Sequence, residues 1–102
     1  MELKKLKDPY VNRLFDAILL LENREECYRF FEDICTIGEV QSMAQRLQVA
    51  EMLKEGRTYT DIAQATGAST ATISRVKRFL NYGANGYNII LERLAKTNQQ
   101  ED

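Results

Sequence analysis

Apolar residues recur three and four positions apart through almost the whole chain, which is the spacing of one face of an α-helix. The first such segment begins at Asp8 and Pro9, a pair that marks a helix start because aspartate caps free N–H groups and proline suits the first turn. Its apolar residues are Val11, Leu14, Phe15, Ile18 and Leu19. We therefore expect an amphipathic helix from residue 9 onward.

Two further helix starts are indicated by a polar residue with glutamate three positions later, the pattern of a capping box. Asn23 with Glu26 opens the second helix, and Thr36 with Glu39 opens the third. The expected apolar stripe of the second helix is Cys27, Phe30, Phe31 and Ile34. The expected stripe of the third helix, which should end at Gly56, is Val40, Met43, Ala44, Leu47, Ala50 and Leu53.

The fourth and fifth helices are predicted to be short and close together. Thr58 with Asp61 opens the fourth, Gly67 ends it, and Ser69 opens a fifth that runs through Leu80. Serine and threonine cap helix starts, and glycine ends a helix because it adopts the left-handed conformation without strain.

A sixth helix is expected after the turn-forming segment 81–86. Its apolar residues are Tyr87, Ile90, Leu91 and Leu94, and residues 97–102 are expected to form a polar tail. No segment has the alternation of a strand. The chain is therefore predicted to be all-α, with six helices in a single domain over residues 1–102.

The 102-residue chain contains no histidine, which removes the commonest general base and metal ligand. No catalytic residue, metal ligand or cofactor is therefore assigned, and an enzyme is not expected. Cys27 and Cys35 lie eight positions apart in one predicted helix, about 12 Å, which is too far for a disulfide. Free thiols, no signal-peptide pattern and no apolar run of about 18 residues predict a cytoplasmic protein without a membrane span.

Charge is unevenly distributed along the chain, although the total is −1 from 14 basic and 15 acidic residues. Residues 1–55 carry 8 basic and 11 acidic groups, and residues 83–102 carry 2 basic and 3 acidic groups. Residues 56–82 carry a net charge of +3, because only Asp61 opposes Arg57, Arg75, Lys77 and Arg78. The positive charge that a polyanion requires is thus confined to one short segment.

That basic segment has the spacing of a helix-turn-helix, predicted over residues 58–80. Ala63 supplies a small residue where the two helices meet, and Gly67, four positions later, permits a left-handed turn. Six positions further on, Ile73 is expected to fill the corner between the helices, with Ile62 and Val76 beside it. A motif of this kind places its second helix in the major groove of DNA.

The polar face of the second helix is the predicted DNA-binding surface, since small hydroxyl and methyl groups approach base edges closely and arginines reach phosphates. Serine and threonine are only moderate helix formers, so their concentration at residues 69–72 is a poor choice for stability alone. The predicted partner is double-stranded DNA. The predicted DNA-binding residues are Arg57, Ser69, Thr70, Ala71, Thr72, Ser74, Arg75 and Arg78.

The chain resembles the Trp repressor superfamily, and within it the YerC/YecD branch of Trp-repressor-like proteins. The strongest matches lie in residues 45–56 and 67–75, and the order and lengths of the six helices are also similar. The resemblance implies an intertwined homodimer, with dimerisation helices at about 9–55 and 87–96 and two projecting helix-turn-helix heads. It also implies a DNA-binding transcriptional regulator that acts as a repressor.

A ligand site is also implied by the resemblance. In Trp repressor, tryptophan binds between two arginines and near a threonine backbone, and the matching positions here are Arg46, Arg75 and Thr36. The family repressor has a glycine after the second arginine and a serine downstream, whereas this chain has Val76 and Phe79. Both larger side chains would fill the slot, which argues against tryptophan and leaves a different small-molecule effector open.

One alternative to DNA binding remains open from the sequence. The helix-turn-helix is also used in protein recognition, so the chain is alternatively a protein-interaction module associated with the transcription machinery. An acidic contact surface for such a partner would come from Glu22, Glu25, Glu26, Glu32 and Asp33. Salt-sensitive affinity for DNA distinguishes the two functions.

Overall fold

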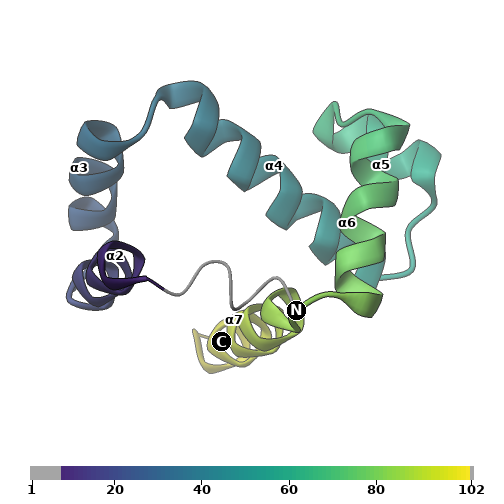
Figure 1. Ribbon diagram of the computed structural model, residues 1–102. Coiled ribbons are helices and arrows are strands. Elements are labelled where there is room, and N and C mark those ends of the chain that lie inside the picture. Colours follow the sequence, from purple (N-terminus) through teal and green to yellow (C-terminus); the bar gives the residue numbers. More distant parts are fainter. Residues whose placement is uncertain (1–7, 102) are drawn as a thin grey trace. The chain divides into compact units, whose positions relative to one another are not determined.

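Six α-helices make up the computed structural model, which describes residues 8–101, and these residues contain no β-strand (Figure 1). The helices are α2 (Pro9–Leu19), α3 (Arg24–Ile34), α4 (Ile37–Lys54), α5 (Tyr59–Thr66), α6 (Thr70–Tyr82) and α7 (Gly86–Glu101). The predicted all-α class with six helices is confirmed. Within the described range, no helix has both the length and the apolar character that a membrane crossing requires.

Polar caps start three of these helices at the predicted residues. Asp8 Oδ1 accepts a hydrogen bond from the N–H of Val11 at 2.8 Å, at the start of α2. Thr58 Oγ1 accepts from the N–H of Asp61, and Ser69 Oγ accepts from the N–H three positions later, each at 3.1 Å. Each cap satisfies an N–H group that has no partner inside its own helix.

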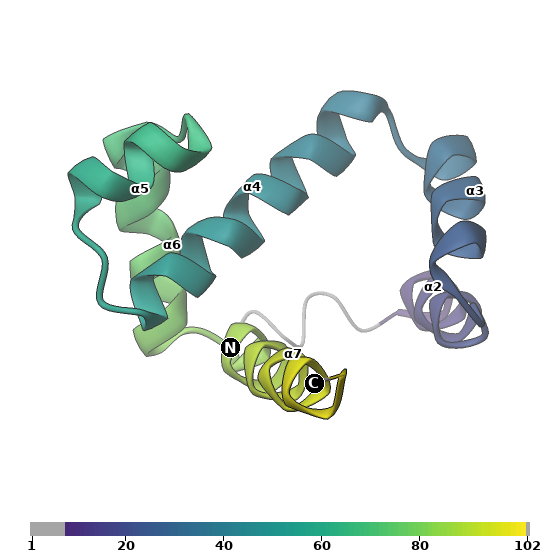
Figure 2. The same cartoon turned by 180° about the vertical axis from the view of Figure 1, so that it is seen from behind.

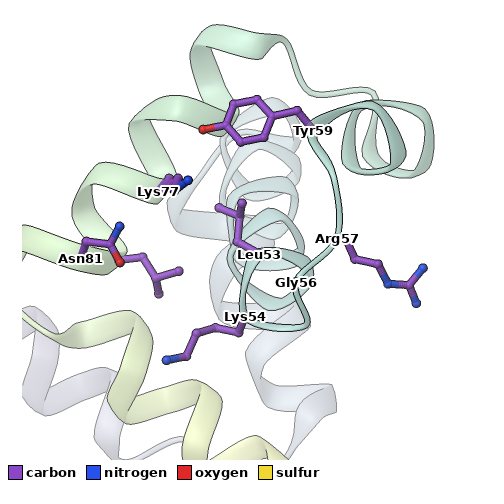
Figure 3. A pocket seen from close by; sticks show the side chains of 8 residues that line it. Leu53, Lys54, Gly56, Arg57, Tyr59, Lys77 and Asn81 are labelled. Carbon is purple, nitrogen blue, oxygen red and sulfur yellow. The ribbon is translucent and has the colours of Figure 1, made fainter.

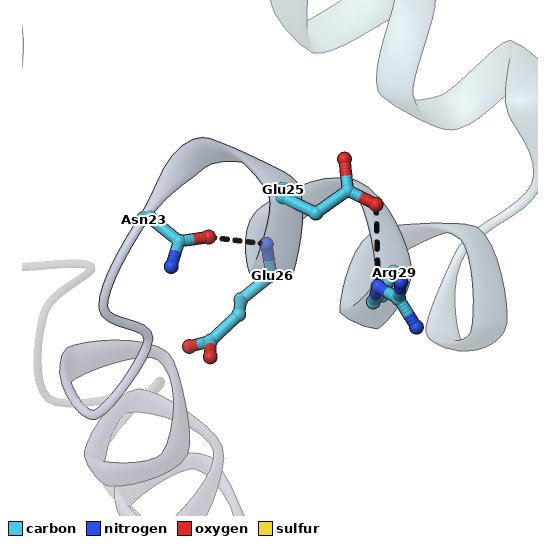
Figure 4. Close-up of polar contacts among 4 residues, drawn as sticks. All are labelled: Asn23, Glu25, Glu26 and Arg29. Atoms are coloured by element: carbon cyan, nitrogen blue, oxygen red, sulfur yellow. Dashed lines mark hydrogen bonds and ion pairs between the residues drawn. The ribbon is translucent and has the colours of Figure 1, made fainter.

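One of the two predicted capping boxes is complete. The N–H of Thr36 donates to Glu39 Oε1 at 2.8 Å, and the N–H of Glu39 donates back to Thr36 Oγ1 at 3.1 Å. At the start of α3, Asn23 Oδ1 accepts from the N–H of Glu26 at 2.9 Å (Figure 4). The carboxylate of Glu26, however, accepts from the N–H of Glu22 rather than from that of Asn23, so the return bond is displaced by one residue.

The chain divides between Val40 and Gln41 into two compact units, and the second contains the buried core. In that unit, α5 and α6 lie beside the C-terminal part of α4 in both views (Figures 1 and 2). The buried hydrophobic residues of the described chain are Val49, Ala50, Ile62, Ala68, Ile73, Val76 and Leu91. The core therefore joins α4, α5, α6 and α7. A single domain over residues 1–102 stays a prediction.

The first unit contains α2 and α3, and neither helix has a buried residue. Phe30 and Phe31 pack edge to face, with ring centroids 5.5 Å apart and ring planes at 84°. Cys27 and Cys35 are free thiols and are half-buried. Large apolar side chains exposed on these two helices are Tyr10, Phe15, Leu19, Tyr28 and Ile34, with Leu20 directly after α2. Apolar surface of this extent is characteristic of an association surface.

Two expectations from the apolar pattern are wrong in detail. Val49 is fully buried although the predicted stripe omits it, whereas Met43 and Ala44 are exposed. The reason is that the core covers the C-terminal part of α4, on the side that carries Val49 and Ala50. The predicted tail is helical as far as Glu101, because no glycine or proline interrupts the chain there.

Candidate nucleic-acid interface

The turn between α5 and α6 is closed by a glycine and a threonine. Gly67 has a φ of 74°, which is left-handed, and its N–H donates to the carbonyl of Ala63 at 2.9 Å. Thr66 Oγ1 donates to the carbonyl of Ile62 at 2.8 Å and accepts from the N–H of Ala68 at 3.1 Å. The bond from Gly67 satisfies a carbonyl that the helix leaves free at its end, and the two bonds of Thr66 hold the turn against the last turn of α5. The predicted glycine turn is confirmed.

The corner between α5 and α6 is filled by the predicted aliphatic residues. Ile62 and Ile73 have no exposed surface, and Val76 is 1% exposed. Ala63 and Leu80 are partly buried against the same cluster. Because this stripe of α6 faces the core, the opposite stripe is held on the outside of the unit.

The outer face of α6 and its first turn carry most of the predicted DNA-binding residues. Those that are exposed are Ser69, Thr70, Ala71, Ser74, Arg75 and Arg78. Thr72 differs from them, because it is half-buried and its Oγ1 lies 3.1 Å from Ser69 Oγ in a hydrogen bond. Thr72 therefore supports the helix start rather than standing out from the face. Its contact with DNA, like that of the other residues, stays a prediction.

Arg57 lies in the loop between α4 and α5, apart from the face of α6. Its N–H donates to the carbonyl of Met52 at 3.1 Å, and its Nε lies 3.3 Å from Glu55 Oε1. Both side chains of this ion pair are more than half exposed, so water screens their attraction. A phosphate at Arg57 would therefore compete only with a weak ion pair.

The residues implied as ligand contacts have different surroundings. Thr36 caps α4, while Arg46 on α4 and Arg75 on α6 are exposed. Val76, at the position of the family's glycine, is buried in the core. Phe79 is 50% exposed, so in the single chain it lies at the surface.

A hollow of about 450 Å³ lies beside α6, between the end of α4 and the start of α5 (Figure 3). Its lining residues are Leu53, Lys54, Gly56, Arg57, Tyr59, Lys77, Leu80 and Asn81. Lys77 Nζ lies 5.8 Å from the centre of the Tyr59 ring, which is a cation–π distance. The sequence prediction counted Lys77 only in the positive charge of residues 56–82, and it gave Lys54 no role. A signal for Lys77 was its place three positions after Ser74, one helical turn along α6.

The functional groups on this surface suit recognition of an anion. The described part of the chain contains no group of three or more cysteine, aspartate and glutamate residues that could hold a metal ion. The surface instead presents hydroxyl groups near the start of α6, the guanidinium groups of Arg75 and Arg78, and two lysines at the hollow. Groups of these kinds bind phosphates and base edges.

Comparison with known proteins gives matches along most of the chain. The family model described as Trp repressor protein matches residues 10–95. YerC of Bacillus subtilis (strain 168) is 58% identical over 97 residues, which are 95% of this chain and 93% of YerC. The crystal structure of a candidate Trp repressor from Staphylococcus aureus has a TM-score of 0.89 at 59% identity, covering 93% of this chain and 95% of that one. A TrpR-like protein from Eubacterium eligens ATCC 27750 has a TM-score of 0.88 at 60% identity, with coverages of 90% and 95%.

Proposed function

Because this chain belongs to the Trp repressor family of helix-turn-helix regulators, we propose that it is a sequence-specific transcriptional repressor that binds operator DNA as a homodimer. In this proposal α6 is the recognition helix, and its first turn faces base edges in the major groove. Arg75 and Arg78, further along the same helix, contact phosphates or guanine edges.

The observation that best supports this function is the division of α6 into two faces. Ile73 and Val76 anchor the helix in the core, so Ala71 and Ser74 stand outward on a rigid element. Small side chains allow a helix to approach base edges closely. The net charge of +3 in residues 56–82 adds attraction to phosphates in the part of the chain that carries this helix.

The homodimer is supported by the uncovered apolar side chains at α2. Tyr10 is 88% exposed, and Leu19 and Leu20 are 80% and 77% exposed. Full burial of one leucine side chain contributes about 1.5–3 kcal/mol, so a face of this kind favours association. A second copy of the chain would cover these side chains and place two α6 helices in major grooves about 34 Å apart.

We also propose that tryptophan is not the corepressor. An indole ring that packs against a glycine backbone in the family repressor would meet the side chain of Val76 here, and Val76 is already packed into the core. The exposed guanidinium groups of Arg46 and Arg75 remain compatible with a different, anionic effector.

The test is selection from a random double-stranded DNA library with the purified protein at physiological salt, with and without free tryptophan. We expect a two-fold symmetric site to be enriched equally in both conditions. The Ala71→Glu variant is the control, because it places a carboxylate on the outer face of α6 without touching the core. It is expected to enrich no site.

Two outcomes would contradict different parts of the proposal. Enrichment that requires tryptophan would contradict the argument from Val76 and leave the DNA-binding function intact. No enrichment, together with no salt-sensitive binding to any duplex, would contradict the DNA-binding function itself. That result would favour the alternative of a protein-interaction module, which a pull-down from cell extract would then address.

A further inference from the structure

The hollow between α4, α5 and α6 combines carbon surface with positive charge. Leu53, Leu80 and the ring of Tyr59 supply apolar contacts, and Lys54 and Lys77 supply two ammonium groups. The hollow has a volume of about 450 Å³ and is open to solvent on one side. A ligand that suits it is an anion attached to a less polar body.

Nearby acidic side chains do not neutralise this charge. Glu55 pairs with Arg57 at 3.3 Å, and Figure 3 shows the guanidinium of Arg57 directed away from Lys54 and Lys77. Asp61 is exposed in the first turn of α5 and does not line the hollow. Lys54 and Lys77 both line the hollow, so an anion bound there is attracted by two ammonium groups.

The hollow continues one edge of the recognition helix. Thr70, Ser74, Lys77 and Asn81 follow one another at intervals of four, three and four positions, so they lie along the same edge of α6. The first two belong to the predicted DNA-binding residues, and the last two line the hollow. Groups that suit base edges and groups that suit phosphates therefore lie along one edge of α6.

We propose that the hollow seats one sugar-phosphate unit of the DNA backbone, with Lys54 and Lys77 at the phosphate and Leu53 and Tyr59 against the sugar. The inference rests on the proposed function, and it adds a contact from α4, which precedes the helix-turn-helix. The Nζ of Lys77 lies 5.8 Å from the centre of the Tyr59 ring, a cation–π contact at an exposed site that places this ammonium group beside the hollow.

The experiment measures the affinity of the full chain for one fixed duplex over a series of salt concentrations. Each phosphate contact contributes about 0.9 to the slope of log K against log salt. Because both lysines are proposed to contact one phosphate, the double variant Lys54→Gln/Lys77→Gln should reduce the slope by about 0.9 per head, or about 1.8 for a dimer with both heads bound. Each single variant should reduce the slope by part of that amount. Lys77→Arg keeps the charge and should keep the slope.

The control is Lys96→Gln, which removes the same charge from α7. Because the predicted dimerisation helices include residues 87–96, its oligomeric state is measured alongside by sedimentation equilibrium. Lys96 is well exposed and lies 3.3 Å from Glu92 in an ion pair, and its removal should leave the salt slope unchanged. The melting temperature of each variant is measured alongside, to show that it is folded. If Lys77→Gln is less stable because the cation–π contact with Tyr59 is lost, the salt slope of Lys54→Gln alone tests the proposal.

Three results would overturn the inference in distinguishable ways. If both glutamine variants bind DNA with the wild-type slope of log K against log salt, the hollow does not hold a phosphate of the DNA backbone. The proposed DNA-binding function would be unaffected by that result. If the wild-type protein does not bind DNA, both the proposed function and the proposed phosphate contact at the hollow are wrong. A rise in wild-type melting temperature with inorganic phosphate, lost in both glutamine variants without any change in the DNA slope, would assign the hollow to a free phosphate compound.

Discussion

The side-chain amide of Gln45 donates a hydrogen bond from Nε2 to the carbonyl oxygen of Thr66, at 3.0 Å and across 21 positions of the chain. Thr66 is the last residue of α5, where helix carbonyl groups have no partner in their own helix. The bond therefore ties α4 to the turn that sets the start of α6. It adds a directional contact to the apolar packing of Val49 and Ala50 in the same unit.

Gln45→Ala removes this bond and is expected to lower the free energy of unfolding by about 1 kcal/mol, because a part-buried carbonyl loses its donor. Gln48→Ala, on the exposed side of the same helix, is the matched control and should change it by less than about 0.5 kcal/mol. Urea unfolding measures both variants. Equal effects would mean that the bond from Gln45 does not contribute to stability.

Gly67→Val forces a β-branched side chain into a φ of 74° and is expected to destabilise the protein by at least about 1–2 kcal/mol. Gly38→Ala is the control, because it lies within α4 and an added Cβ meets no atom within 4 Å. It should stabilise the protein by up to about 1 kcal/mol. Thermal unfolding compares the two. An unchanged melting temperature for Gly67→Val would contradict the position of the turn.

Ser74→Glu places a carboxylate on the outer face of α6 and is expected to weaken binding to duplex DNA by at least about 10-fold, because like charges at an interface repel strongly. Thr97→Glu introduces the same charge at an exposed position of α7 outside the predicted dimerisation helices and should have little effect. Fluorescence anisotropy with labelled duplex measures both affinities. A Ser74→Glu protein with wild-type affinity would show that this face does not meet DNA.

Leu19→Lys replaces a side chain that is 80% exposed in the single chain, where such a change costs less than about 0.5 kcal/mol. In the proposed dimer the lysine would be covered by the second copy, so we expect weaker association. Sedimentation equilibrium measures the dissociation constant, and the melting temperature at a given protein concentration should be lower than that of the wild type. Ala17→Lys, at an exposed position on the opposite side of the same helix, is the comparison. Equal dissociation constants would place Leu19 outside the dimer interface.

Glu39→Gln tests the pH dependence of the capping box at α4. The pKa of Glu39 is lowered, first by the hydrogen bond from the backbone N–H of Thr36 and then by the Thr36 hydroxyl. Because the pKa of Glu39 is lower in the folded than in the unfolded state, its ionised carboxylate stabilises the folded protein at neutral pH. This stabilisation is lost as the pH falls through the pKa of the folded state.

Unfolding free energies measured from neutral to acid pH should therefore fall more steeply for the wild type than for Glu39→Gln. The control is Glu32→Gln, which removes an exposed carboxylate from α3. Its unfolding free energy should fall toward acid pH as steeply as that of the wild type. Parallel curves for the wild type and Glu39→Gln would show that the capping carboxylate does not contribute to the acid dependence.

Much of the outer face of α6 was predictable from local rules. Ser69 and Gly67 mark the ends of two helices, and burial of Ile73 and Val76 leaves the opposite face of α6 outward. The orientation of Thr72 was not predictable from the apolar pattern alone. Its hydroxyl turns to the cap at Ser69 because it lies near the edge of the buried stripe.

The sequence alone was sufficient for the six helices, their capped starts, the glycine turn and the membership of a family, because each depends on residues a few positions apart or on matched motifs. Only the tertiary structure decided that Val49 belongs to the core, that Gln45 reaches Thr66, and that Lys54 and Lys77 share one hollow. The physical reason is that these relationships depend on which side of α4 the other helices cover. The side of α4 that is covered depends on the total apolar area that several helices bury together. The spacing of apolar residues within one helix does not determine that area.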